Sequence, residues 1–120
     1  MKIAFSATSD SLDAALDPRF GRAKGFLVVD LDQDRSEFID NHQNLNAAQG
    51  AGIQAAETVS RSGAGALVTG HCGPKAFRAL AASGIRIYHT DATTVAEALA
   101  RYREGKLVEV GAADVEGHWV

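Results

Sequence analysis

Apolar residues along this chain fall into short blocks that polar, glycine-rich segments separate. Continuous or alternating apolar runs predict five β-strands. The predicted strands are Lys2–Ala7, Phe26–Leu31, Ser36–Asn41, Ala66–Gly70 and Ile85–His89. Only the four residues DQDR separate the second strand from the third, so these two strands should form an antiparallel hairpin.

After the third strand the pattern changes, and apolar residues recur at helical spacing in three segments. The predicted inward-facing positions are Ile53, Ala56 and Val59 in the first, Phe77, Leu80 and Ala81 in the second, and Val95, Leu99 and Tyr102 in the third. Pro74 suits the first turn of the second helix, and Thr94 with Glu97 forms a capping box for the third. One further helical turn is expected at Leu12–Leu16, and a short strand at Leu107–Val110.

The element order is therefore βββαβαβα, which predicts an α/β domain with a mixed five-stranded sheet flanked by helices. The same order is found in ribonuclease-H-like folds. The two strand–helix–strand crossovers make the third, fourth and fifth strands parallel. We expect a single domain over residues 1–110 and a flexible C-terminal tail over residues 111–120.

Composition narrows the function classes. The chain has 120 residues and a net charge of −3, which disfavours a surface that binds nucleic acid. Its single cysteine excludes an internal disulfide, and no apolar run is long enough to span a membrane. We expect a cytoplasmic protein, and the acidic surface with 7% aromatic residues favours a monomer.

In the predicted sheet, four loops share the edge formed by the carboxyl ends of the parallel strands. They are Thr8–Gly25, His42–Gly52, Gly70–Gly73 and His89–Thr93. Ligands of open α/β sheets bind outside this edge. Two helices begin there, and their N-termini carry partial positive charge. Arg19, Arg22, Lys24 and Lys75 add cations, so the expected ligand is an anion.

His71 and Cys72 lie in the loop after the fourth strand and leave three interpretations open. The pair could be metal ligands, although no Cys-x-x-Cys or His-x₃-His spacing accompanies it. Cys72 could be a nucleophile with His71 or His89 as its base, but no orienting carboxylate is evident. It could also be a small residue in a tight turn. A nearby helix N-terminus should lower the pKa of the thiol, which would favour a thiolate near a metal or an anion.

Two other enzyme or cofactor classes do not fit. Two-metal nucleases need carboxylates clustered near central strand ends, and the strands IAFSA and ALVTG have none. A dinucleotide site is also disfavoured, because the GAG that opens the first helix lacks the fuller G-x-G-x-x-G pattern.

Five stretches taken in order resemble the accessory proteins of nitrogenase iron–molybdenum cofactor biosynthesis. They are MKIAFSA, DPRFGRAKGFLVVD, GAGIQAAETV, GALVTGHCGPKAFRAL and GIRIYHTDATTVAEALARYREGKL. The resemblance extends to about Val110, and within the family it is greatest to the orange-protein group of sulfate-reducing bacteria. It implies a ribonuclease-H-like fold and a protein that binds or carries molybdenum-containing metal–sulfur clusters rather than an enzyme. For that group the implied cargo is a molybdenum–copper sulfide cluster held without covalent bonds.

The residues expected to bind this cofactor belong to three of the four loops of the carboxyl edge and to the start of the second helix. They are Arg19, Phe20, Gly21, Arg22, Gly50, Gly52, Gly70, His71, Cys72, Gly73, Pro74 and Lys75. Phe20 and Phe77 are expected to shield the sulfides from water. No residue is predicted as a direct metal ligand, with His71 and Cys72 limited to weak or indirect contact. The alternatives are a regulatory domain that recognises an unknown protein partner without a cluster, and a thiol enzyme that uses Cys72 and His71.

Overall fold

Eight elements follow one another in the predicted order in a computed structural model, which describes residues 1–41 and 50–111. They are β1 (Lys2–Ala7), β2 (Gly25–Asp30), β3 (Arg35–Asp40), α1 (Ala51–Arg61), β4 (Ala66–Thr69), α2 (Pro74–Ala82), β5 (Arg86–His89) and α3 (Val95–Arg103). The predicted strand and helix positions are therefore correct to within one or two residues at most ends.

The five strands form one mixed sheet in the order β3-β2-β1-β4-β5. β2 pairs antiparallel with both β1 and β3, whereas β4 pairs in parallel with β1 and with β5. All strands except β2 therefore point in one direction, and their carboxyl ends share an edge. This confirms the predicted ribonuclease-H-like arrangement and the position of the expected binding edge.

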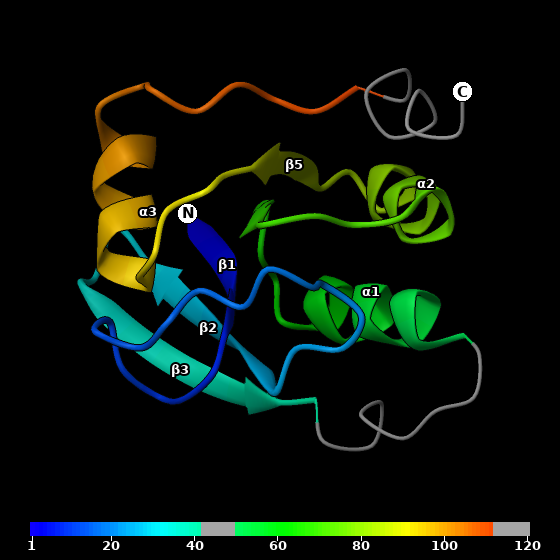
Figure 1. The fold of residues 1–120 in the computed structure, drawn as a ribbon, viewed down its shortest axis with the longest axis horizontal. Helices are drawn as coiled ribbons and strands as arrows, with labels where there is room; N and C mark the ends of the chain where they lie inside the picture. Colours follow the sequence, from blue (N-terminus) through cyan, green and yellow to red (C-terminus); the bar gives the residue numbers. More distant parts are fainter. Residues whose placement is uncertain (42–49, 112–120) are drawn as a thin grey trace.

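Helices cover both faces of the sheet (Figure 1). α1 and α2 lie together on one face, and α3 lies on the other. The core under α1 and α2 includes Phe26, Leu67 and Leu80, and the core under α3 includes Phe5, Val68 and Val95. Because strand side chains alternate between faces, the continuous apolar runs of β1, β2 and β4 supply both cores.

Two predicted inward-facing helix positions are wrong. Ile53 is 41% exposed and Ala81 is also exposed, whereas Ala55, Ala56 and Val59 of α1 are buried. In an alanine-rich helix, apolar residues stand on either side of the true inward stripe, so spacing alone does not fix its rotation about the axis. The inward positions predicted for α3 are confirmed at Val95 and Leu99, and Tyr102 is half-buried.

Two minor predicted elements do not form. Leu12–Leu16 contains a turn followed by isolated bridges of Ala15 and Leu16, not a helical turn. Leu107–Val110 makes one isolated bridge, Glu109 to Tyr88, and the Val110 N–H donates to the Ile87 carbonyl at 2.7 Å. This segment therefore covers part of the β5 edge without forming a sixth strand.

Two predicted segments fall largely outside the described residues. They are residues 42–49 of the loop predicted at 42–52, and the predicted tail apart from Gly111. The domain boundary at residue 110 thus stays a prediction. Among the described helices, none is both long enough and apolar enough to cross a membrane.

Candidate functional site

The loop between β1 and β2 crosses the carboxyl edge of the sheet and is fixed there by buried hydroxyl groups. The Ser6 hydroxyl lies 2.7 Å from the Asp17 carbonyl oxygen and 2.8 Å from the Thr69 hydroxyl, and Ser6 and Thr69 are both fully buried. The Asp17 N–H also donates to the Ser6 carbonyl at 2.8 Å. These bonds hold the loop against the ends of β1 and β4, beneath the candidate site.

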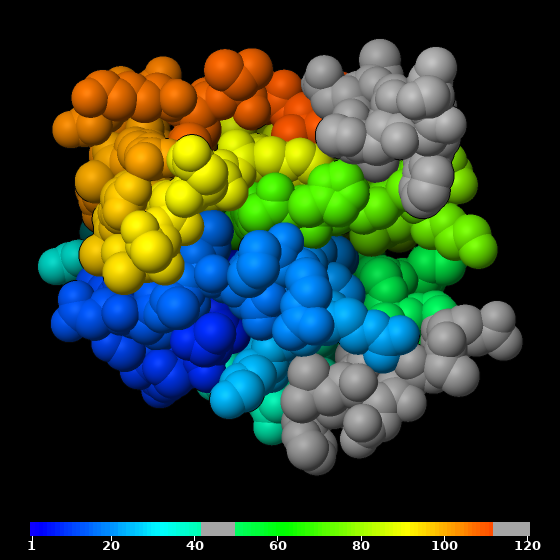
Figure 2. Space-filling view, viewed as in Figure 1, coloured from blue at the N-terminus to red at the C-terminus, as the bar shows by residue number. Residues whose placement is uncertain are grey.

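The same loop then lies along the turn between β4 and α2. The Phe20 N–H donates to the His71 carbonyl at 3.1 Å, and Arg19 forms a parallel bridge with His71. In Figure 2 the blue atoms of this loop lie against the green atoms of the segment that follows β4. At Gly70 a Cβ atom would stand only 2.5 Å from the Pro18 Cα, so the approach of the two segments requires glycine there.

Next, the loop reaches the start of α1. A Cβ on Gly21 would stand 3.0 Å from the Gly52 amide nitrogen, so the two backbones are in close contact. Asn41 fixes the far end of the loop, because its side-chain amide donates to the Ala23 carbonyl at 2.9 Å. The predicted site residues from three loops are therefore adjacent in the fold.

The starts of α1 and α2 also meet. A Cβ on Gly52 would stand 3.2 Å from the Ala76 Cβ, and a hollow of about 260 Å³ opens beside them, lined by Gly50, Gly52, Ile53 and Lys75. Gly50 precedes α1 with φ of 79°, in the left-handed region. Neither helix has a side-chain cap or an acidic residue in its first turn. α3 is different, because Thr94 accepts the Glu97 N–H and Glu97 stands in its first turn.

Four cations belong to the loop before β2 and to the first turn of α2. The Arg19 side chain is 69% exposed, and its Nε lies 3.6 Å from the buried Asp17 carboxylate. Lys24 and Lys75 are exposed, and Arg22 is half-buried. Another hollow, of about 210 Å³, lies at the opposite edge among residues of mixed charge that include Lys2, Asp30 and Glu37. Only the carboxyl edge combines a hollow with helix starts in the described part of the chain.

The role predicted for Phe20 needs correction, whereas that of Phe77 stays a prediction. Phe20 is only 1% exposed, and its ring packs in the core at a centroid distance of 5.3 Å from the Phe26 ring. It therefore supports the loop from below and does not cover a ligand at the surface. Phe77 is half-buried and packs against the same core.

The predicted pKa shift of Cys72 is also wrong. Its side chain belongs to the core, with 2% exposure, and burial raises the pKa of the thiol to about 11. The cost of burying a thiolate thus exceeds any effect of the nearby helix N-terminus. A neutral, buried thiol is a poor nucleophile and a poor metal ligand, which argues against the thiol enzyme.

His89 is absent from the residues predicted to bind the cofactor, although the sequence offered it as a possible base for Cys72. It ends β5, and its Nε2 accepts the Cys72 backbone N–H at 3.2 Å, while its ring centroid lies 5.1 Å from that of His71. The only signal in the sequence was its position at a strand end that faces the expected edge.

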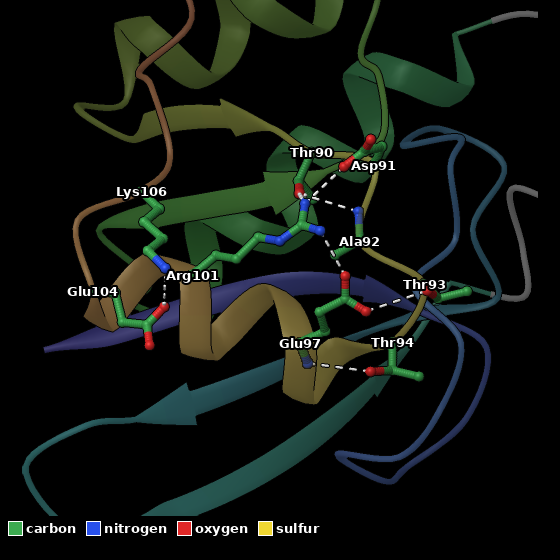
Figure 3. Close-up of polar contacts among 9 residues, drawn as sticks. All are labelled: Thr90, Asp91, Ala92, Thr93, Thr94, Glu97, Arg101, Glu104 and Lys106. Atoms are coloured by element: carbon green, nitrogen blue, oxygen red, sulfur yellow. Dashed lines mark hydrogen bonds and ion pairs between the residues drawn. The ribbon is translucent and has the colours of Figure 1, made fainter.

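The loop after β5 is held by a polar network on α3 (Figure 3). Arg101 of α3 donates to Asp91 and to Glu97, with N–O distances of 2.7 Å in both cases. The Arg101 hydrogen bond lowers the pKa of the Asp91 carboxyl, as the charge pairing requires. This network ties the loop after β5 to α3.

The described residues offer no conventional metal coordination sphere. Within residues 1–41 and 50–111, no group of three His, Cys, Asp or Glu side chains is placed to hold a metal ion. What the edge presents instead is backbone N–H groups, exposed cations and a shallow hollow. This surface suits a preformed anion better than a bare metal ion.

Comparison with known proteins agrees with these features. The family model described as dinitrogenase iron-molybdenum cofactor matches residues 1–105. An uncharacterized protein of Methanocaldococcus jannaschii is 30% identical over 110 residues, which is 89% of each chain.

Two solved structures are similar in sequence as well as in fold. The apo form of the orange protein from Desulfovibrio gigas is 43% identical, with a TM-score of 0.89 and 92% of each chain covered. A NifB-type protein of Thermotoga is 28% identical, with a TM-score of 0.79, and the match covers 90% of this chain and 91% of that one. These similarities confirm the resemblance seen in the sequence.

Proposed function

This chain belongs to the dinitrogenase iron-molybdenum cofactor family, and we propose that it binds and carries an anionic metal–sulfur cluster at the carboxyl edge of its sheet. The cargo we propose is a sulfide of molybdenum and copper, held without covalent bonds. The role is binding and carriage rather than catalytic turnover. Similarity to the orange protein of Desulfovibrio gigas, at 43% identity, supports the binding of a metal cluster or cofactor in general.

The observation that carries the proposal is the meeting of two helix starts for which the described residues show no side-chain cap. The first-turn N–H groups of α1 and α2 have no acceptor within their own helix, and Gly52 and Ala76 bring the two starts together. Each helix start contributes about 0.3–1 kcal/mol toward binding an anion. Two starts with several cations suit a cluster of multiple negative charge.

The donor set favours electrostatic binding over ligation. Cys72 is buried with a raised pKa, and the described residues include no cluster of metal-binding side chains. Thiometallate sulfurs already complete the coordination of their metals, so such a cargo needs N–H donors and positive charge rather than protein thiolates. Arg19, Arg22 and Lys75 supply that charge around the hollow.

Anaerobic reconstitution tests the proposal. The purified protein is incubated with thiomolybdate and a copper salt, desalted, and analysed for molybdenum and copper per chain and for visible absorption. We expect a coloured complex of fixed stoichiometry. The double variant Arg19→Ala/Arg22→Ala should lose most of the bound metal because two cations at the edge are removed.

A matched control removes the same charge elsewhere. Arg35 begins β3 and Arg103 ends α3, so both lie at the opposite edge, and both are exposed. Arg35→Ala/Arg103→Ala should assemble the cluster like the parent protein. Equal loss in both variants would show that net charge alone matters, which contradicts this site. If the parent chain takes up neither metal, carriage of the cluster is wrong and recognition of a protein partner becomes the better hypothesis.

A further inference from the structure

We propose that His89 is a positioning residue for this edge: as a neutral imidazole it accepts the Cys72 N–H and thereby holds the turn that starts α2. The expected effect of His89 on cargo binding rests on the proposed function, whereas its role in holding the turn does not.

The turn needs such support because its own sequence restricts the backbone conformation only weakly. Glycines stand at both ends of the four-residue segment Gly70–Gly73, and glycine restricts the backbone less than any other residue. Pro74 then fixes the first helical position. Between β4 and Pro74, contacts from neighbouring segments must therefore determine where the chain lies.

One peptide group in this turn is held at both of its polar atoms. The carbonyl of His71 accepts the Phe20 N–H at 3.1 Å, and the N–H of Cys72 donates to His89 Nε2 at 3.2 Å. These two atoms belong to the same planar peptide. The loop before β2 thus holds the peptide from one side, and the end of β5 holds it from the other.

His89 itself is fixed by the sheet. It pairs with Thr69 in the β4–β5 ladder, and the N–H of the next residue, Thr90, donates to the Thr69 carbonyl at 3.0 Å. The ring is half-buried, with the His71 ring beside it. Because His89 is fixed in the sheet, its bond to the Cys72 N–H holds the start of α2 in place against the sheet edge.

Accepting an N–H requires a particular form of the imidazole. Nε2 must be unprotonated, so the proton of the neutral ring lies on Nδ1. Among the described residues, the titratable or charged groups beside His89 include His71 in the turn, Asp91 in the following loop, Arg101 of α3, and Lys106 after it. Addition of a proton to Nε2 removes the acceptor, so the bond forms only while the ring is neutral.

Nuclear magnetic resonance of the cargo-free protein tests the positioning. At about pH 8 the side-chain nitrogen shifts of His89 should show the Nδ1–H tautomer, and the Cys72 amide should be protected from exchange. At a lower pH, where the same nitrogen shifts report a protonated His89 ring, the protection factor of the Cys72 amide should fall about fivefold, the equivalent of one ordinary hydrogen bond. A Cys72 amide that is indifferent to His89 titration would overturn the inference.

Three variants separate the acceptor from other effects. Gln carries an amide oxygen near the position of Nε2 and does not titrate, so His89→Gln should keep the Cys72 amide protected at both pH values. His89→Phe keeps a ring without an acceptor and should lower protection at both. His71→Gln removes the neighbouring titration and should leave the acid response in place; loss of that response would assign it to His71 and overturn the inference.

Cargo binding is then compared at about pH 7.5 only, because acid can decompose thiometallates. His89→Phe should retain several-fold less molybdenum after desalting than the parent protein, and His89→Gln should recover most of the loss. Equal retention by all three chains would overturn the link to cargo. If the parent chain binds no cluster, the proposed function fails, whereas the amide measurements still decide the positioning role.

Discussion

At the scale of single residues, Cys72 couples its ionisation to folding. Burial raises the pKa of its thiol to about 11, well above the ordinary value of a thiol. As the pH rises, the unfolded chain loses this proton before the folded chain does. The stability that the neutral thiol contributes is therefore present near neutral pH and is lost between about pH 9 and 11. We expect the free energy of unfolding to fall by about 1–2 kcal/mol more than in Cys72→Ala between about pH 8 and 10.

Urea unfolding of the two proteins at several pH values measures this difference. Lysine and tyrosine titrations occur in both chains and cancel in the comparison. Parallel pH profiles would contradict the burial of a neutral thiol. They would also reopen the interpretation of Cys72 as a reactive thiolate.

At the scale of elements, the β4–α2 turn offers a matched pair of glycines. A Cβ on Gly70 would stand 2.5 Å from the Pro18 Cα and 2.7 Å from its carbonyl oxygen, so Gly70→Ala must move backbone. We expect it to cost about 1–3 kcal/mol in the free energy of unfolding. Gly73→Ala meets nothing within 4 Å and should cost less than about 1 kcal/mol, mainly through the helix cap. Urea denaturation of both variants measures the contrast, and equal costs would contradict the close approach of Pro18.

The elements were predictable where a local pattern determined them. The apolar runs of β1, β2 and β4 act over a few residues and formed as expected. Of the predicted capping box, the bond from the Glu97 N–H to the Thr94 hydroxyl is present, while the Glu97 carboxylate accepts from Thr93 and Arg101. The rotation of α1 was not predictable, because alanines flank its inward face and Ile53 matched the spacing equally well. Short-range patterns specify the type of an element better than its orientation.

The site was predictable only as a set of loops at one edge. The topology correctly brought Arg19, Gly52 and Gly73 to the same side of the sheet. Contacts between segments distant in sequence decided the rest: the burial of Cys72, the role of Phe20 below the surface, and the bond from Cys72 to His89. Such contacts depend on packing distances of a few tenths of an ångström, which no pattern along the chain records.

At the scale of the whole molecule, the helix starts proposed to bind cargo and the core under α3 lie in different layers. α1 and α2 supply the helix starts, whereas α3 covers the opposite face with its own core around Val95, which is fully buried. Val95→Ala should lower the free energy of unfolding by about 1–3 kcal/mol through the cavity it leaves. Its cargo uptake should equal that of the parent protein under conditions where both are folded, because distant sites contribute additively.

The double variant Arg19→Ala/Arg22→Ala should show the opposite pattern, with stability kept and cargo lost. Arg19 and Arg22 lie outside the core, so their removal should change the free energy of unfolding by less than about 1 kcal/mol while most of the cargo is lost. Urea denaturation and metal analysis on the same protein batches give both quantities for each variant. If Val95→Ala remained folded and yet lost its cargo, the layer under α3 would have to shape the edge, and the site would extend beyond the starts of α1 and α2.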